Sequence, residues 1–263
     1  VKVVLNGDGG DELFGGYRRH VAARTMARLA WVPRPLAALA ATALAPGRLP
    51  RRTLLGYVGR LARGLALPAA ERYLVFTSDM LRDADKRPWW RGAALPTERL
   101  VEDLVRGDLG ALDRQVNAEL ALNLPSSLLV KMDIATSAFS LEGRSPLLDH
   151  ELGEFALKLP DDHKVRGRRT KAILRDAYAG LLGAEVVTGK KRGFEVPLAA
   201  WLRGPWRELI GDTLGAPDAK ALGYVDGALI RQVLGADSFQ DRNKAYVTYA
   251  FLVLELWLRS VEA

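Results

Sequence analysis

The chain opens with VKVVLNGDGGDELFGGY (residues 1–17), the stretch that most strongly constrains its fold. The run VKVVL is apolar and rich in β-branched residues, which predicts a strand over residues 1–5. The glycines that follow predict a tight turn, and a helix is expected to begin near Asp11. Strand, glycine-rich turn and helix start together form a common anion site, because the backbone can approach a ligand closely and the helix N-terminus offers N–H donors.

The same turn carries three acidic residues, Asp8, Asp11 and Glu12, which would repel a bare phosphate group. A Mg²⁺ ion would remove this conflict, because it binds one or two carboxylates together with phosphate oxygens. The alternative is that the acids only complement the dipole at the start of a helix. A dinucleotide fingerprint is excluded by Glu12 at a glycine position, and a Walker A loop by the absence of Gly-Lys-Ser/Thr.

Composition narrows the class of protein. The 263 residues are 49% hydrophobic and 26% charged, as expected of one large or two small globular domains. The absence of cysteine excludes disulfides, thiolate metal sites and a cysteine nucleophile within these residues. The formal charge is +7, but the basic residues are dispersed and not interleaved with aromatic residues, which favours a nucleotide over nucleic acid as the partner. No apolar run reaches the roughly 20 residues of a membrane span, so we expect no membrane partner and a cytoplasmic location.

Beyond the turn, the pattern predicts a mostly helical chain. The first helix is expected to run past Leu29 and to end at Pro33. Residues 141–146 are expected to be irregular and residues 188–196 to form a loop. Only the first strand is convincing, so its partners are expected upstream of Val1 or in a weak segment of this chain. Further helices are expected between residues 35 and 110, over residues 109–124, over residues 128–140 with a serine cap, after Asp149, after Thr170, and over residues 243–259.

Four segments, taken together, resemble the asparagine-synthetase family. GDGGDELFGGY (residues 7–17) is similar to the family's second signature loop. LPSSLLVKMDIATSAFSLEGRSPLLDH (residues 124–150) is similar to the family block LPxxLLxKxDxxSMxxSLExRxPFLD. KRGFEVP (residues 191–197) resembles K-x-G-F-x-x-P, and LELWLR (residues 254–259) resembles the closing L-E-x-W. The segments occur in the family's order and extend from the first residue to about residue 259.

The resemblance implies a fold and a reaction. The parent domain would be an α/β domain of the adenine-nucleotide α-hydrolase, ATP-pyrophosphatase type. Residues 1–263 would be its C-terminal portion, mostly α-helical with one N-terminal strand. The implied reaction is the ATP- and Mg²⁺-dependent amidation of aspartate to asparagine through an acyl-adenylate, with ammonia from glutamine. The S-G-G-x-D-S phosphate loop and the glutaminase domain of the family are absent from residues 1–263 and are expected upstream, so this chain alone is expected to be inactive. A homodimer is a further expectation.

The resemblance also implies a nucleotide-binding set in the turn. Asp11 is expected to bind Mg²⁺. Asp8 stands where relatives often have glutamate, and it is expected either to orient or deprotonate the attacking nitrogen or to be a structural turn carboxylate. The residues expected to line the nucleotide are Asn6, Gly7, Gly9 and Gly10.

Further site residues are expected downstream of the turn. Lys191 matches the family lysine that contacts the departing phosphates, since a cation on a glycine-containing loop can stabilise developing negative charge. A solvated lysine is the alternative at this position, and Lys171 is a second candidate cation at the nucleotide. Glu142 and Arg144 form either a buried ion pair or a functional pair, with Glu142 supporting Asp8 or the substrate and Arg144 near the nucleotide.

Two other functions remain open. The domain could act on another carboxylate, as amidotransferases and ring-closing synthetases similar to this family do. It could instead be a non-catalytic binding module without the phosphate loop, although the presence of both Asp11 and Lys191 argues against this. No metal-ligand spacing connects the three histidines, and we predict that none is catalytic: His20, His150 and His163.

Overall fold

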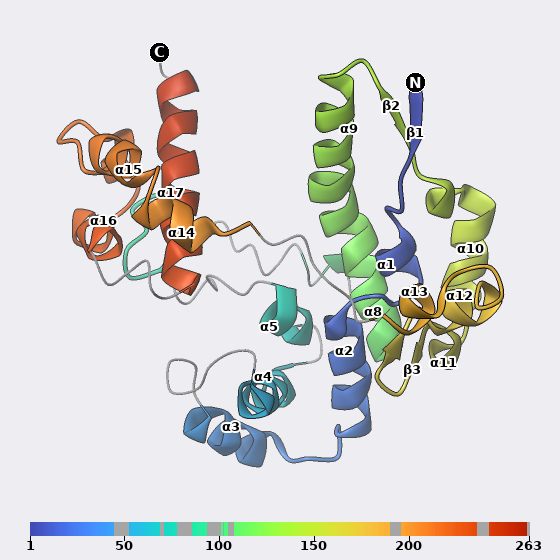
Figure 1. The fold of residues 1–263 in the computed structure, drawn as a ribbon. Helices are drawn as coiled ribbons and strands as arrows, with labels where there is room; N and C mark the ends of the chain where they lie inside the picture. The colour runs from blue at the N-terminus through green and yellow to red at the C-terminus, as the bar shows by residue number, and fades with distance from the viewer. Residues whose placement is uncertain are drawn as a thin grey trace. The chain divides into compact units, whose positions relative to one another are not determined.

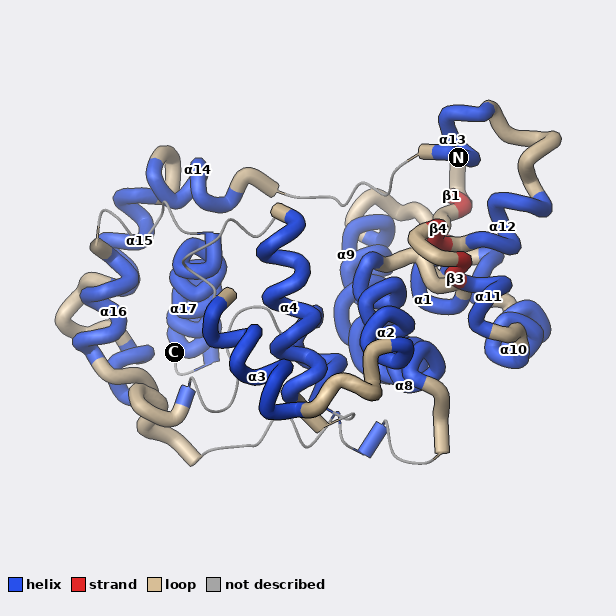
Figure 2. Tube along the Cα trace, turned by 90° about the horizontal axis from the view of Figure 1, so that it is seen from below, coloured by secondary structure: helices blue, strands red, loops and turns tan. Residues whose placement is uncertain are grey.

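Helices dominate the chain and the strands are few and short, as Figures 1 and 2 show. The computed structural model describes residues 1–44, 53–68, 71–77, 86–93, 101, 103–104, 108–189, 196–235 and 242–261. The chain divides into two units. Unit 1 comprises Val1–Thr77 and Arg99–Arg192, and unit 2 comprises Ser78–Glu98 and Gly193–Ala263.

In unit 1 the first strand has a partner within the chain. Strand β1 (Val3–Leu5) pairs in parallel with β2 (Glu142–Arg144), with Val4 opposite Gly143 (Figure 1). The prediction of a single strand is therefore wrong, and so is that of a wholly irregular segment over residues 141–146. The alternative that the first strand pairs with a weak segment of this chain is confirmed. The sequence Glu-Gly-Arg lacks the apolar alternation that identifies a half-buried strand, because this short strand is defined by main-chain hydrogen bonds rather than by buried side chains. A second small sheet pairs β3 (Val165–Arg166) with β4 (Arg169–Thr170) in antiparallel fashion.

The helix expected from Asp11 past Leu29 is interrupted. The structure has a short α1 (Gly10–Leu13) followed by α2 (Arg18–Arg28). Gly15 lies between them with φ +70°, a left-handed conformation that favours glycine, and a Cβ at this position would lie 2.7 Å from Val165 Cγ2. The break between α1 and α2 therefore lies where β3 packs closely against Gly15. The local sequence does not reveal this contact.

The serine cap predicted near residue 127 is also wrong. Helix α8 (Ala111–Ala118) continues through the wide-turned η2 (Glu119–Leu129) into α9 (Val130–Ser137), and Figure 1 shows the three as one long helix. Pro125 lies inside this run. Proline lacks an N–H group, and the wider turns of a π-type segment accommodate a residue that cannot donate to the usual i−4 carbonyl.

The helix predicted after Asp149 is confirmed as α10 (His150–Lys158). The Asp149 side chain caps it by accepting hydrogen bonds from the N–H groups of Glu151 and Leu152, both at 3.1 Å. The buried Leu13 and Phe14 pack in a cluster that includes Leu147, Leu148 and Ala156, among others. This cluster attaches the glycine-rich turn to the segment before α10. The remaining elements of unit 1 are α3 (Arg34–Ala43), α4 (Leu54–Ala66), η1 (Glu71–Tyr73), α5 (Leu74–Thr77), η3 (Pro146–Leu148), α11 (Asp161–Lys164), α12 (Ala172–Ala177) and α13 (Ala184–Thr188).

Unit 2 is organised around its last helix. The predicted terminal helix is confirmed as α17 (Arg242–Val261), and its buried Phe251, Leu252 and Leu258 belong to the main apolar core of the unit. The other elements are α14 (Leu198–Arg203), α15 (Arg207–Leu214), η4 (Lys220–Gly223) and α16 (Gly227–Leu234). Within the described part of the chain, none of the helices is both long enough and apolar enough to cross a membrane.

Candidate functional site in the glycine-rich turn

Asn6 joins two of the segments singled out in the sequence. Its side-chain oxygen accepts hydrogen bonds from the Ser145 hydroxyl at 2.7 Å and from the Asp8 N–H at 3.0 Å. Its own N–H donates to the Arg144 carbonyl at 2.8 Å, which continues the β1–β2 pairing. The turn at residues 7–17 is therefore fixed to the segment at residues 124–150 by both side-chain and main-chain contacts.

Close packing explains two of the predicted turn glycines. Gly9 precedes α1 with φ +88°, and a Cβ there would lie 2.2 Å from Leu148 Cδ2. A Cβ on Gly10 would lie 2.8 Å from Leu147 Cδ1. By contrast, a Cβ on Gly7 would meet no atom within 4 Å. The first two glycines are thus explained by packing, and Gly7 is the one with open space beside it.

Asp11 and Lys171 come together from distant parts of the sequence. The Lys171 Nζ lies 3.0 Å from Asp11 Oδ1, and the exposed fractions of the two side chains are 28% and 15%. Lys171 precedes α12 with φ +51°, a left-handed conformation that is unfavourable for a residue with a Cβ. Gly16 lies against the pair: a Cβ there would be 1.8 Å from Asp11 Oδ1 and 2.5 Å from Lys171 Cε. Only glycine leaves room for this ion pair.

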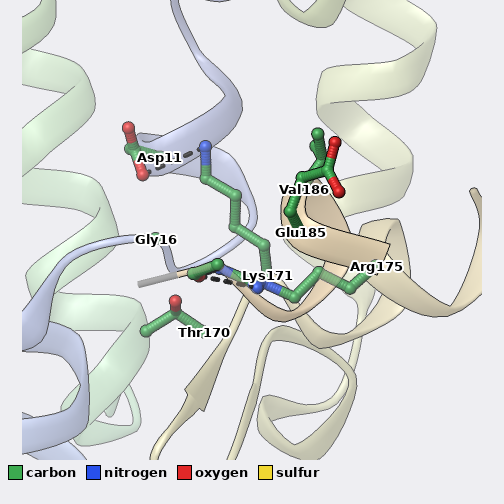
Figure 3. Close-up of a pocket in the computed structure, with 8 residues that line it drawn as sticks. Asp11, Gly16, Thr170, Lys171, Arg175, Glu185 and Val186 are labelled. Atoms are coloured by element: carbon green, nitrogen blue, oxygen red, sulfur yellow. Dashed lines mark hydrogen bonds and ion pairs between the residues drawn. The ribbon is translucent and has the colours of Figure 1, made fainter. Parts of the chain in front are cut away.

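A pocket of about 260 Å³ opens beside the Asp11–Lys171 pair (Figure 3). Arg175 forms part of its wall and donates from Nη1 and Nη2 to the Gly189 carbonyl, both at 3.1 Å. The pocket therefore combines two cations with two carboxylates in a space suited to a small charged ligand. Its lining residues are Asp11, Gly16, Thr170, Lys171, Arg175, Glu185, Val186 and Gly189.

A buried charge network supports the turn. The Tyr17 hydroxyl donates to the buried Glu12 carboxylate, and Arg19 pairs with the buried Glu119, its Nη2 donating to Oε2 at 2.6 Å. Burial raises the pKa of the Glu119 carboxyl, although the Arg19 guanidinium acts in the opposite direction. Burial, with a contribution from Arg19, lowers the pKa of the His20 imidazole to about 3, so this histidine is neutral at neutral pH.

The Asp11 carboxylate is the group in the turn that fits Mg²⁺, and Asp8 is a second carboxylate close to it in the sequence. Asp8 Oδ2 is buried and has no hydrogen-bond partner within the described residues. The Asp11 carboxylate already has a cation beside it, Lys171, and faces the pocket. Mg²⁺ is a hard cation that typically takes one or two carboxylates together with phosphate oxygens and water. In the described part of the chain, no three acidic or histidine side chains gather into a cluster that could hold a metal ion by themselves.

The Glu142–Arg144 pair is not buried, so the expectation of a buried ion pair is wrong. Arg144 Nη2 lies 2.6 Å from Glu142 Oε1, and the exposed fractions of the two side chains are 65% and 58%. They alternate with Gly143 on a short strand, which directs both side chains to the same, open face. The backbone of Arg144 nevertheless contacts Asn6, as described above. Lys191, the other predicted cation, lies outside the described residues, as does the rest of residues 190–195.

Sequence reasoning missed several pocket residues. Arg175 follows Lys171 by four residues in TKAILR, a spacing that places both on one face of a helix and could have suggested a second cation. Gly16 could have been suspected as part of a Gly-Gly pair. Thr170, Glu185 and Gly189 have no comparable pattern, because only the tertiary fold brings their segments to the turn.

Comparison with known proteins yields one family and several relatives. The family model described as asparagine synthase matches residues 1–259. A Mycobacterium tuberculosis protein named "Putative asparagine synthetase (glutamine-hydrolyzing)" is 32% identical over 266 residues, covering 98% of this chain and 39% of that protein. Asparagine synthetase (glutamine-hydrolyzing) 1 of Bacillus subtilis is 26% identical over 264 residues, covering 96% of this chain and 40% of that protein.

A shorter match extends to a differently named protein. Amidase chry2 of Gibberella zeae is 32% identical over 92 residues, which cover 33% of this chain and 14% of that protein. No solved structure matches the chain. The chain spans about 40% of the length of the longest-matching curated relatives.

Proposed function

Because this chain belongs to the asparagine synthase family, we propose that its glycine-rich turn, Asp11 and Lys171 form part of the nucleotide site of an amide-forming ligase. The observation that carries the proposal is the Asp11–Lys171 pair at 3.0 Å beside a pocket with a second cation, Arg175. A carboxylate that can hold a metal ion and cations that can meet phosphate are the groups needed to bind and stabilise a departing pyrophosphate.

The proposed reaction is ATP-dependent conversion of aspartate to asparagine. The aspartate carboxylate attacks the α-phosphorus of ATP, pyrophosphate leaves, and ammonia from glutamine then displaces AMP from the acyl-adenylate. Mg²⁺, when bound, supplies positive charge that neutralises the phosphate groups. The ammonia would come from a glutaminase domain of the same polypeptide, and residues 1–263 would be the C-terminal portion of the synthetase domain. A homodimer in the cytoplasm remains a prediction.

The residues of this chain take distinct roles in the proposal. Asp11 holds the metal ion, and Lys171 neutralises charge that develops on the leaving pyrophosphate. Asn6 fixes the turn against β2 through the Ser145 hydroxyl and its own main-chain bond, so the turn presents its backbone to the nucleotide in one conformation. Asp8, whose Oδ2 is buried and has no hydrogen-bond partner among the described residues, orients or deprotonates the attacking nitrogen. Lys191 is proposed as a further phosphate contact on the basis of the resemblance alone.

The test uses the full-length gene product that contains residues 1–263. Asp11→Asn and Lys171→Met should each reduce aspartate-dependent pyrophosphate release from ATP by at least about 100-fold, as expected when a group that stabilises transition-state charge is removed. Lys158→Met is the matched control, because Lys158 is exposed and pairs with Glu154 at 3.7 Å, away from the pocket lining. The proposal fails if both site variants retain wild-type rates. Residues 1–263 alone should release no pyrophosphate.

A second candidate is amidation of a carboxylate other than that of aspartate. The shorter match to a protein named as an amidase favours it, because that name, unlike asparagine synthetase, specifies no aspartate substrate. A screen of carboxylate substrates, read as pyrophosphate release by the full-length protein, distinguishes the two. A non-catalytic binding module would bind nucleotide without releasing pyrophosphate for any carboxylate.

A further inference from the structure

Lys171 stands where a bound cation would contact Asp11. Its ammonium group lies 3.0 Å from Asp11 Oδ1, so the carboxylate already has a positive partner at close range. The same ammonium group borders the pocket, whose other lining groups include the Arg175 guanidinium (Figure 3). Lys171 can therefore reach either the carboxylate or a ligand in the pocket, but a single ammonium group cannot serve both sites fully.

The packing around the pair restricts how it can adjust. Gly16 lies against the Asp11–Lys171 pair, since a Cβ there would be 1.8 Å from Asp11 Oδ1 and 2.5 Å from Lys171 Cε. Lys171 also has φ +51°, a left-handed conformation that is unfavourable for a residue with a Cβ. Gly16 therefore blocks movement of the Lys171 side chain on one side. The pocket lies on another side, and 28% of the lysine side chain is exposed, so the side chain can move into the pocket.

We infer that Lys171 occupies the cation position beside Asp11 until a divalent ion arrives, and that metal binding and transfer of Lys171 to phosphate are one exchange. This inference rests on the proposed function, since it assigns the metal to Asp11 and the phosphate to the pocket. The metal alone binds weakly, because it must displace an ammonium group from the carboxylate. The metal together with phosphate binds tightly, because the displaced lysine gains a new anionic partner.

The physical basis is a competition between two cations for one carboxylate. Opposite charges 3.0 Å apart attract each other strongly in a partly buried site, so the resident ammonium group is a strong competitor. A cation that binds only after the pair opens has its apparent affinity reduced by the fraction of open molecules. Linkage then requires that phosphate and metal strengthen each other's binding by the same factor.

The test measures Mn²⁺ binding, as a spectroscopic substitute for Mg²⁺, by electron paramagnetic resonance in the full-length protein. Without phosphate, Lys171→Met should bind Mn²⁺ at least tenfold more tightly than wild type. Lys171→Arg retains the charge and should bind as weakly as wild type, and Lys158→Met should not differ from it. With inorganic pyrophosphate present, the order should reverse, because only the wild type and the arginine variant keep a cation at position 171 for the phosphate.

The outcomes separate the inference from the proposed function. If Asp11→Asn leaves Mn²⁺ binding unchanged both with and without pyrophosphate, the metal site itself is wrong and the proposed function fails. If binding depends on Asp11 but Lys171→Met does not tighten it, only the exchange is overturned. Lys171→Gln replaces the methionine variant if that variant does not fold. If neither folds, the wild type still decides, because pyrophosphate must tighten Mn²⁺ binding beyond the affinity of Mn²⁺ for free pyrophosphate.

Discussion

The glycine-rich turn of unit 1 and the core around α17 of unit 2 both contain segments that resemble the family, yet they are stabilised differently. The turn depends on glycines, on the hydrogen bonds of Asn6 and on the partly buried ion pair between Asp11 and Lys171. The core around α17 is apolar, and its buried carboxylate, Glu255, accepts hydrogen bonds from two backbone N–H groups and from Arg259. Two segments that resemble the same family therefore need not share a role. The turn lines a pocket, whereas the α17 segment stabilises the core of unit 2.

The largest effect is expected at Glu255, because its role is structural. It is fully buried and accepts hydrogen bonds from the N–H groups of Lys220 at 3.1 Å and Ala221 at 2.7 Å and from Arg259 Nε at 2.7 Å. Glu255→Ala should lower the free energy of unfolding by about 3–5 kcal/mol, since it leaves these donors unpaired. Urea unfolding followed by tryptophan fluorescence measures it, because five of the six tryptophans lie in unit 2.

Glu208→Ala is the matched control for this prediction. Glu208 is exposed on α15 in the same unit, and its replacement should change the unfolding free energy by less than about 0.5 kcal/mol. The pKa of Glu255 is also informative: burial opposes ionisation, but the hydrogen bonds from Ala221 and Arg259 hold it below its usual value. Its contribution should therefore be present above the unfolded pKa and be lost as the pH falls through the lower folded value. Equal losses in both variants would contradict the structural role.

Gly16→Ala should separate activity from stability in unit 1. The new Cβ would overlap Asp11 Oδ1 and Lys171 Cε, which are side-chain atoms that can move away at modest cost. We expect pyrophosphate release to fall by about 100-fold, or roughly 2.7 kcal/mol of transition-state stabilisation, while the unfolding free energy changes by less than about 1 kcal/mol. A variant that unfolds but keeps its rate per folded molecule would contradict this.

Gly153→Ala is the control that matches it chemically. Gly153 lies within α10, and a Cβ there would meet nothing within 4 Å. Alanine is favoured over glycine in a helix by roughly 1 kcal/mol, so this variant should be slightly more stable and fully active. The pair of variants shows whether the turn glycines are retained for the site or for the fold.

The sequence predicted the local features of both regions and missed the long-range ones. The turn at residues 7–17, the helix after Asp149 and α17 were each predicted, because glycines and apolar periodicity act over a few residues. Strand β2 and the break at Gly15 were not, because each depends on a partner far away in the sequence: β1 for the strand and β3 for the break. In the same way the pocket beside Asp11 required α12 and α13, whose approach no local pattern indicates.

His20 allows the two units to be distinguished by pH. Burial lowers the pKa of this imidazole to about 3, well below its ordinary value of about 6.5. The unfolded state therefore binds a proton that the folded state does not, and the stability of unit 1 should fall by up to about 1.4 kcal/mol per pH unit as the pH drops below 6.5. Hydrogen exchange of unit 1 peptides at pH 7.5 and pH 5 should show this loss, amounting to about 2 kcal/mol. Peptides from unit 2 should not show the His20 contribution.

His20→Gln should remove that part of the pH dependence, whatever the replacement costs at both pH values. His150→Gln is the control, because the side chain of His150 is 84% exposed. If the two variants show the same pH dependence as the wild type, the buried imidazole does not control the stability of unit 1.

The smallest effect on stability is expected at Glu142 and Arg144. Their variants test whether this pair acts in the reaction or only in the fold. The pair is more than half exposed, and such pairs contribute about 0.2–1 kcal/mol, so Glu142→Gln, Arg144→Gln and the double variant should form a cycle with a coupling within that range. Any larger consequence must then come from the reaction. Since the backbone of Arg144 is bonded to Asn6, a substrate in the turn would lie near this strand. If Glu142→Gln lowers pyrophosphate release by tenfold or more at unchanged stability, the pair belongs to the site with Asp11 and Lys171; if it leaves the rate unchanged, the strand serves the turn through its backbone alone.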